Sequence, residues 1–186
     1  MHIITRRKMI SVTALSLAGL ITRPLGTETA QAASLDANVE DTLRNFHRHV
    51  RGTRELVASA AAVLVFPTVV KAGIGIGGEY GEGALLSRGR PVEYYSTASA
   101  SIGFQLGAQA RSIIIVFMTE QALADFKRVD GWKVGVDGSV ALINVGVGGS
   151  IDTNRIASPI VGFIFDGKGL MYNLTLEGTK ISRMVR

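Results

Sequence analysis

The first pattern along the chain is a helical stripe of apolar residues spaced three or four positions apart: Leu35, Val39, Leu43, Phe46 and Val50. This spacing places them on one face of an amphipathic helix over residues 35–50. Acidic residues lie near its start and arginines near its end, an order that complements the helix dipole. Gly52 is predicted to end this helix, and residues 54–62 are predicted to form a second one.

From residue 73 onward, apolar and polar residues alternate and glycine is frequent, which predicts strands. They are expected at 74–80, 84–87, 92–96, 101–109, 112–117, 139–147, 160–165, 170–176 and 180–184. Thr119 is predicted to cap one inserted helix that extends to about Lys127. The apolar segment 58–66 is too short to cross a membrane and is predicted to be buried.

These elements predict an α+β fold. N-terminal helices are followed by a mostly antiparallel, glycine-rich β-sheet or barrel-like domain with one inserted helix.

The first 32 residues have the organisation of a secretory signal peptide. Basic residues at 6–8 precede a mostly apolar run, Met9 to Ile21, and Ala30-Gln31-Ala32 matches a cleavage pattern. The adjacent residues Arg6 and Arg7 also resemble a twin-arginine export signal. The sequence therefore predicts a signal peptide over residues 1–32, cleaved after Ala32, and a single domain over residues 33–186. The mature protein is expected in the periplasm or at the periphery of the cell envelope; an uncleaved anchor or a buried helix is the alternative.

Charge and composition narrow the classes of function. The chain has 186 residues, with 20 Lys and Arg against 15 Asp and Glu, a net charge of +5. Cleavage would remove four of the 20 basic and one of the 15 acidic side chains and leave a net charge of +2, so no nucleic-acid partner is expected. The absence of cysteine excludes disulfides, thiolate metal sites and acylation of a cysteine within this sequence.

No short motif is sufficient for catalysis. Gly73–Gly78 matches G-x-G-x-x-G, but two more glycines follow where a nucleotide site needs a helix, so a closely packed or curved strand is expected. His47 and His49 would point apart on a helix and could not share a metal. No nucleophile motif is present. We expect no catalytic residue, metal or cofactor, and an enzyme that uses Glu79 and Glu82 is the least favoured hypothesis.

The first helix is the best candidate for a binding surface. A basic amphipathic helix suits an anionic membrane, with its apolar face in the acyl boundary and its arginines on phosphates. The alternative is that the apolar stripe packs on the β domain. The candidate lipid-binding residues are Arg44, Phe46, Arg48, Arg51 and Arg54, with Lys71 near the glycine-rich segment as a headgroup contact.

Blocks spread over most of the mature chain resemble the SYLF domain family in the expected order. They are residues 61–67, 71–73, 77–83, 101–109, 167–170 and 176–178. Many members have Trp-Ser where this chain has Tyr94-Tyr95-Ser96. The family includes bacterial exported proteins and eukaryotic membrane-associated adaptors.

The resemblance implies lipid binding. Eukaryotic members engage phosphoinositides, with an N-terminal amphipathic segment implicated, and a yeast member binds actin filaments. For an exported bacterial protein it implies binding to phospholipid headgroups, and it supplies no catalytic residue. The sequence thus favours a non-catalytic domain whose partner is an anionic phospholipid or membrane surface. The alternative is a protein-interaction module that binds an envelope partner.

Overall fold

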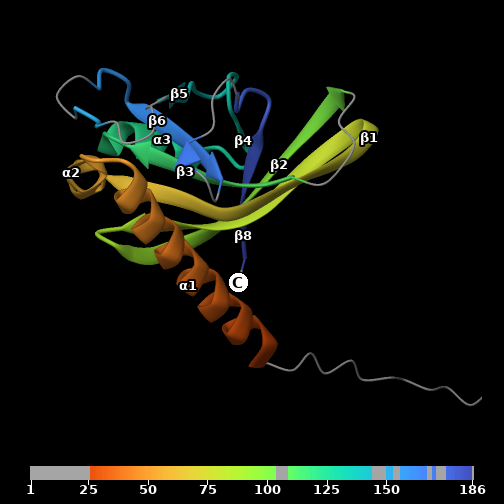
Figure 1. The fold of residues 1–186 in the computed structure, drawn as a ribbon, viewed down its shortest axis with the longest axis horizontal. Helices are drawn as coiled ribbons and strands as arrows, with labels where there is room; N and C mark the ends of the chain where they lie inside the picture. The colour runs from red at the N-terminus through yellow and green to blue at the C-terminus, as the bar shows by residue number, and fades with distance from the viewer. Residues whose placement is uncertain are drawn as a thin grey trace, which may run out of the picture.

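The described part of the chain forms one curled, mostly antiparallel sheet with helices on both faces (Figure 1). The structure is a computed structural model that describes residues 26–103, 109–143, 150–152, 156–166, 169–170 and 175–185. Its helices are α1 (Gly26–His49), α2 (Thr53–Ser59) and α3 (Glu120–Arg128). Its strands are β1 (Ala62–Ser87), β2 (Arg90–Gly103), β3 (Gln109–Phe117), β4 (Trp132–Lys133), β5 (Ala141–Leu142), β6 (Ile160–Asp166), β7 (Gly169–Leu170) and β8 (Lys180–Met184).

The strands are ordered β4-β8-β2-β1-β3-β6-β5, and β7 pairs with β6. All of these pairs are antiparallel except β5 with β6. The predicted α+β fold, with N-terminal helices, a mostly antiparallel sheet and an inserted helix, is confirmed.

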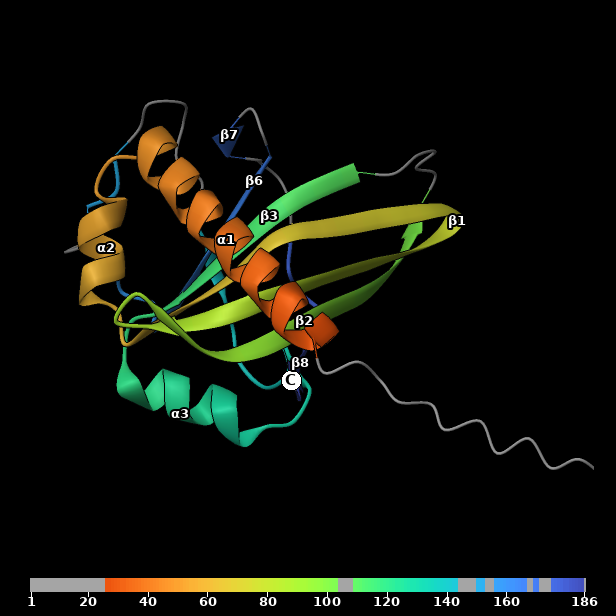
Figure 2. The same ribbon diagram turned by 90° about the horizontal axis from the view of Figure 1, so that it is seen from below.

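The long strand β1 accounts for much of the sheet. Its first part pairs with β3 over residues 62–71, and its later part pairs with β2 over residues 75–87. Figure 2 shows β1 extending away from the helices and then returning. The two parts approach closely at Gly83, where a Cβ atom would lie 2.3 Å from the carbonyl oxygen of Val65.

The G-x-G-x-x-G segment, residues 73–78, lies within β1, as expected, and β1 continues after it without a helix.

Both faces of the central strands are covered, which explains their continuous apolar sequences. Along β3, Ile113, Ile115 and Phe117 belong to a core beneath α3, which we call the α3-side core. Ile114 and Val116 belong to a second core beneath α1 and α2, the α1-side core. The central strands β1, β3 and β6 thus contribute residues to both cores.

Local signals placed several element ends correctly. α1 ends at His49, and Gly52 follows with a left-handed backbone (φ 81°) and with Ile151 against its Cα, so a side chain would clash there. The Thr119 hydroxyl accepts a hydrogen bond from the Ala122 amide (3.2 Å) and caps α3. α1 starts earlier than expected, and the strands predicted at 74–80 and 84–87 are parts of β1.

Four predictions fall partly outside the described residues. These are the signal peptide, most of which is not described, and the strands expected at 101–109, 139–147 and 170–176. Among the helices described, none is both long and apolar enough to cross a bilayer.

Candidate functional site

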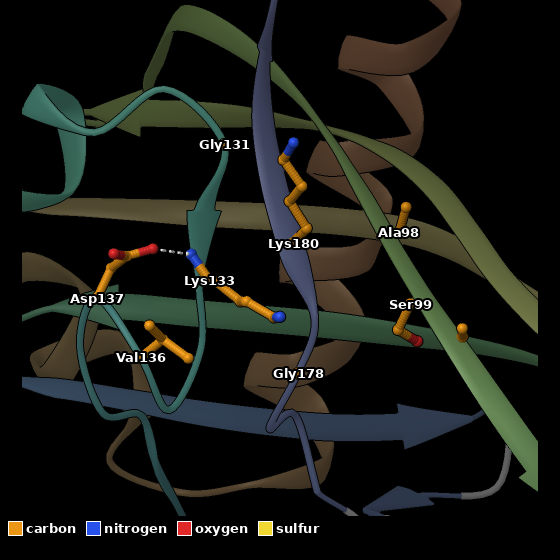
Figure 3. A pocket seen from close by; sticks show the side chains of 9 residues that line it. Ala98, Ser99, Gly131, Lys133, Val136, Asp137, Gly178 and Lys180 are labelled. Carbon is orange, nitrogen blue, oxygen red and sulfur yellow. Dashed lines mark hydrogen bonds between the residues drawn. The ribbon is translucent and has the colours of Figure 1, made fainter.

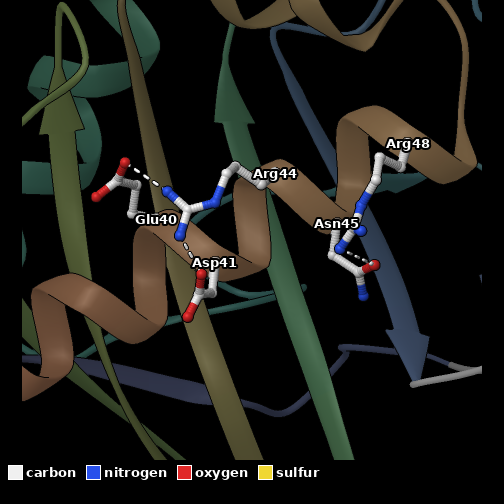
Figure 4. A network of polar contacts seen from close by, with 5 residues as sticks. All are labelled: Glu40, Asp41, Arg44, Asn45 and Arg48. Atoms are coloured by element: carbon white, nitrogen blue, oxygen red, sulfur yellow. Dashed lines mark hydrogen bonds and ion pairs between the residues drawn. The ribbon is translucent and has the colours of Figure 1, made fainter.

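The arginines predicted to bind lipid lie at the surface of α1 and α2 and in the segment between them. Arg44 forms salt bridges with Glu40 (2.6 Å) and Asp41 on the same helix (Figure 4). Arg48 contacts the Asn45 side-chain oxygen at 3.4 Å. Within the described ranges, Arg48, Arg51 and Arg54 are exposed and form no salt bridge. The structure thus places Arg44 and Arg48 on α1, Arg54 on α2 and Arg51 between the two helices. Of these four, Arg44 has its charge paired with acidic side chains.

Phe46 does not lie on this exposed surface. Its side chain is 1% exposed, and its ring centroid lies 4.8 Å from that of Phe163 and 5.9 Å from that of Phe165. The sheet face on the α1 side is apolar, and the apolar stripe of α1 packs against it and shields it from water. The expectation that Phe46 faces a membrane is therefore corrected: its ring is in the core, and the alternative of packing on the β domain is what the structure has.

His47 connects the two N-terminal helices. Its Nδ1 lies 2.9 Å from the Thr53 hydroxyl, which itself donates to the Val50 carbonyl oxygen at 2.9 Å. Because that hydroxyl has one hydrogen, Nδ1 of the neutral ring must donate to it. Burial, and secondly the charge of Arg54, lower the pKa of His47 below its usual value, against a smaller opposing effect of Glu55. His47 is thus a structural residue between α1 and α2.

Lys71 lies in a different place from the arginines. Its ammonium group is 3.6 Å from the Glu79 carboxylate, which also binds Arg111 through its second oxygen. Arg111 lies two positions before Ile113 on β3, so its side chain points to the same side of the sheet, the side covered by α3. The Arg111 Nε is buried without a hydrogen-bond partner. The structure does not bring Lys71 together with the α1 and α2 arginines, and its charge is already paired.

The two carboxylates considered for acid–base chemistry do not form a pair. Glu79 and Glu82 are three positions apart in a regularly paired part of β1, so their side chains point to opposite faces of the sheet. Glu79 is buried in its ion pairs, whereas Glu82 accepts a hydrogen bond from the Tyr80 hydroxyl (3.0 Å). No group of three or more metal-binding side chains occurs among the described residues.

An ionic network around Glu93 was not predicted from the sequence. The Glu93 carboxylate accepts from the Tyr95 hydroxyl (2.7 Å) and binds Lys127 of α3 (3.0 Å) and Arg183 of β8 (3.5 Å). Burial opposes its charge, but these partners together hold the pKa of Glu93 below its usual value. The network attaches α3 and β8 to β2, and no local signal relates three segments so far apart in the chain.

A shallow cavity of about 590 Å³, which we call the lysine cavity, lies between β2, β4 and β8 and was not predicted from the sequence (Figure 3). Lys133 and Lys180 line it from adjacent strands, where they are direct cross-strand partners. The rest of the lining is small or polar apart from the apolar side chain of Val136: Ala98, Ser99, Ala100, Gly131, Asp137 and Gly178. The pairing register of β4 and β8 creates this concentration of positive charge.

Residues 98–185 match the family model Ysc84, described as Las17-binding protein actin regulator. This part of the chain belongs to the Ysc84 (SYLF) family. The matched segment contains the last part of β2 (residues 98–103), β3, α3 and the lysine cavity, whereas α1, α2, β1 and the first part of β2 lie outside it. No curated protein matches the chain.

The family assignment confirms the resemblance drawn from the sequence. The SYLF domain is generally a binding domain related to lipid and actin binding, and not a catalytic one. The match thus favours a binding domain, and the described residues contain two groups of exposed basic side chains without salt bridges: Arg48, Arg51 and Arg54 at α1 and α2, and the lysines of the cavity at β4 and β8.

Proposed function

We propose that this protein is a non-catalytic phospholipid-binding protein of the periplasm or cell envelope, and that it binds anionic headgroups through α1 and α2. The observation that supports this proposal is that Arg48, Arg51 and Arg54 are exposed and form no salt bridge within the described ranges. Arginine is well suited to this role because its guanidinium group can donate two hydrogen bonds to one phosphate.

Burial of the apolar stripe of α1 determines the mode of binding. Val39, Phe46 and Val50 pack on the sheet, so a docked α1 has no apolar face to insert into a bilayer. Binding is then peripheral and electrostatic, and it weakens as salt shortens the range of charge interactions. Near an anionic surface each basic side chain contributes about 1 kcal/mol.

Export is part of the proposal, and the packing of α1 is compatible with it. Residues 1–25 lie outside the described residues, and the expected cleavage point after Ala32 falls within α1. Among the described side chains of α1, Val39 is the first that is buried, so cleavage would leave the contacts of α1 with the sheet in place. N-terminal sequencing of the protein from its native envelope should begin at Ala33; a chain that retains residues 1–32 would contradict export by cleavage.

The test of lipid binding is vesicle flotation of the full chain with phosphatidylglycerol and with phosphatidylcholine vesicles over a range of salt concentrations. The R48Q/R51Q/R54Q variant removes the proposed contacts. Its matched control, R88Q/R90Q/R128Q, removes the same charge from exposed arginines elsewhere. Loss of three contacts should weaken binding to phosphatidylglycerol by about 100-fold at low salt, and the control should stay close to the unmodified protein.

Two results would contradict this proposal: no binding to anionic vesicles at low salt, or an equal loss of binding in both variants. The second would show a general effect of net charge and not a site on α1 and α2.

The family description favours a protein partner as the second candidate. Because the matched family is described as Las17-binding and as an actin regulator, the domain could bind an envelope protein. Crosslinking should then capture the same partner with the unmodified chain and with the R88Q/R90Q/R128Q control. Vesicle binding would be no stronger than that of an unrelated protein of equal charge.

A further inference from the structure

The cavity between β2, β4 and β8 has an unusual pairing of charges. Lys133 of β4 lies directly opposite Lys180 of β8, and Lys180 lies directly opposite Ala98 of β2. Directly opposed residues share a face of the sheet. Both lysines point away from the α3-side core, because their neighbours Trp132 and Ile181 belong to it.

Like charges in this arrangement repel each other and destabilise the pair of strands. Neither Lys133 nor Lys180 forms a salt bridge with any described residue. In Figure 3 the two side chains point in different directions, that of Lys133 across towards β8 and that of Lys180 along β8. An anion held between them would remove this repulsion, so the strand pairing itself favours a negatively charged ligand.

The backbone around Lys133 is held in place before any ligand binds. The Asp137 carboxylate accepts a hydrogen bond from the Lys133 amide (2.7 Å), and the Asp137 amide donates to the Lys133 carbonyl oxygen (2.9 Å). Asp137 is the acidic residue of the cavity lining, and it is bound to the backbone of the turn. The lining side chains therefore carry two positive charges and one negative charge.

The remaining walls leave space beside the lysines. Ala98, Ala100 and Gly178 add little side-chain volume. A Cβ atom on Gly131 would lie 2.3 Å from the Lys180 Cε atom, so the glycine makes room for the lysine side chain. Val136, which is 73% exposed, adds an apolar surface to the lining. The cavity thus offers two cations beside small apolar groups.

We propose that Lys133 and Lys180 form a binding site for a phosphate monoester carried on a small polyol such as glycerol. A phosphate dianion balances both ammonium charges, and lysine binds phosphate as a point charge without demanding a fixed geometry. The small side chains contact the carbon skeleton of the ester. The site is separate from the arginines of α1 and α2 and does not depend on their function. The ester can be a soluble metabolite or a lipid headgroup.

Phosphorus NMR and calorimetric titration of the full chain at low ionic strength test the site, with sn-glycerol 3-phosphate and with inorganic phosphate. Loss of two charge-assisted contacts in K133Q/K180Q should weaken glycerol phosphate binding by at least about tenfold. The K133R/K180R variant should retain binding because it keeps both charges. The R90Q/R128Q control loses the same charge at exposed positions elsewhere and should bind within about twofold of the unmodified protein.

Vesicle flotation separates the two sources of the ester. Binding of soluble glycerol phosphate that depends on the lysines supports a soluble ligand. Lysine-dependent flotation with phosphatidic acid, without affinity for the soluble ester, supports a lipid headgroup. In both cases R48Q/R51Q/R54Q should keep the lysine-dependent component, which separates this site from the proposed membrane surface.

Three results would overturn the proposal. They are no binding of either form of the ester, unchanged binding by K133Q/K180Q, and an equal loss in K133Q/K180Q and R90Q/R128Q. Circular dichroism spectra of all variants should match that of the unmodified chain, because both lysines are exposed.

Discussion

The ring of Phe46 shows how one residue determines what α1 offers to a ligand. It lies against Phe163 and Phe165 in the α1-side core, where a smaller side chain would leave a cavity. Its contribution is therefore to the stability of the docked helix, and the exposed arginines remain for contact with a partner.

We expect Phe46→Ala to lower the free energy of unfolding by about 3–5 kcal/mol, because it removes buried apolar surface and leaves a void. Urea denaturation measures this change. At temperatures where the variant stays folded, its binding to anionic vesicles should equal that of the unmodified chain. Unchanged stability together with lost vesicle binding would instead place Phe46 at the membrane.

His47 makes the stability of the α1–α2 junction depend on pH. Its pKa is lowered in the folded protein, so below the ordinary value of 6.5 the unfolded chain binds more protons than the folded one. The stability contributed by neutral His47 is present above pH 6.5 and is lost as the pH falls towards the lower folded pKa.

Replacement of His47 by Asn should reduce this loss, because the amide can donate to Thr53 but does not titrate. Urea denaturation between pH 7 and 5 gives the comparison, and His49→Asn, on the exposed side of α1, is the control. An equal pH dependence in the unmodified protein and His47→Asn would show that other groups cause it.

Glu93, whose pKa is also lowered, loses its ionic contribution in more acidic solution, below its usual value of 4.5.

Among the elements, β1 depends most on its glycines. The two parts of the strand lie so close that a Cβ atom at Gly83 would be 2.3 Å from Val65 O and 2.6 Å from the Phe66 ring. The same atom at Gly78 would meet one described neighbour, Ser99 O, at 3.7 Å. The two positions share a strand and differ in available space.

Gly83→Ala should destabilise the protein by about 1–3 kcal/mol because the added methyl group overpacks the sheet. Gly78→Ala, the matched control, should be neutral or stabilise by up to about 1 kcal/mol through the unfolded chain. Thermal unfolding of both variants measures the difference. Equal effects at the two positions would contradict the close approach within β1.

At the scale of the whole molecule, β3 and β6 lie between the two cores. α1 and α2 cover one face of the sheet, α3 covers the other, and the strands β4 and β5 at its ends are two residues long. Stability should therefore decrease from the middle of the sheet towards its ends.

Hydrogen exchange followed by mass spectrometry should find the slowest amides in residues 113–117 and 161–165, where exchange requires global unfolding. Amides of β4 and β5 should exchange faster through local opening. Uniform exchange across the sheet would show that its ends are as stable as its middle.

The elements that depend on local sequence were predictable. The period of the apolar stripe predicted α1, Thr119 predicted the start of α3, and alternation predicted β8 at its observed bounds. Each of these signals acts within a few residues, through side-chain direction or a backbone hydrogen bond. The family resemblance was also visible in short blocks of sequence.

The tertiary structure decided what these elements contact. A helical stripe is apolar in the same way whether it covers a sheet or a membrane, so the sequence left both roles of Phe46 open. The opposition of Lys133 to Lys180, and the partners of Glu93, follow from strand register and helix docking between distant segments. Register depends on the packing of the whole sheet, because a shift by one residue turns every side chain to the other face. The apolar periodicity of the sequence thus determined the helices and strands of this protein. Long-range packing determined which of their charged side chains lie next to each other at the surface.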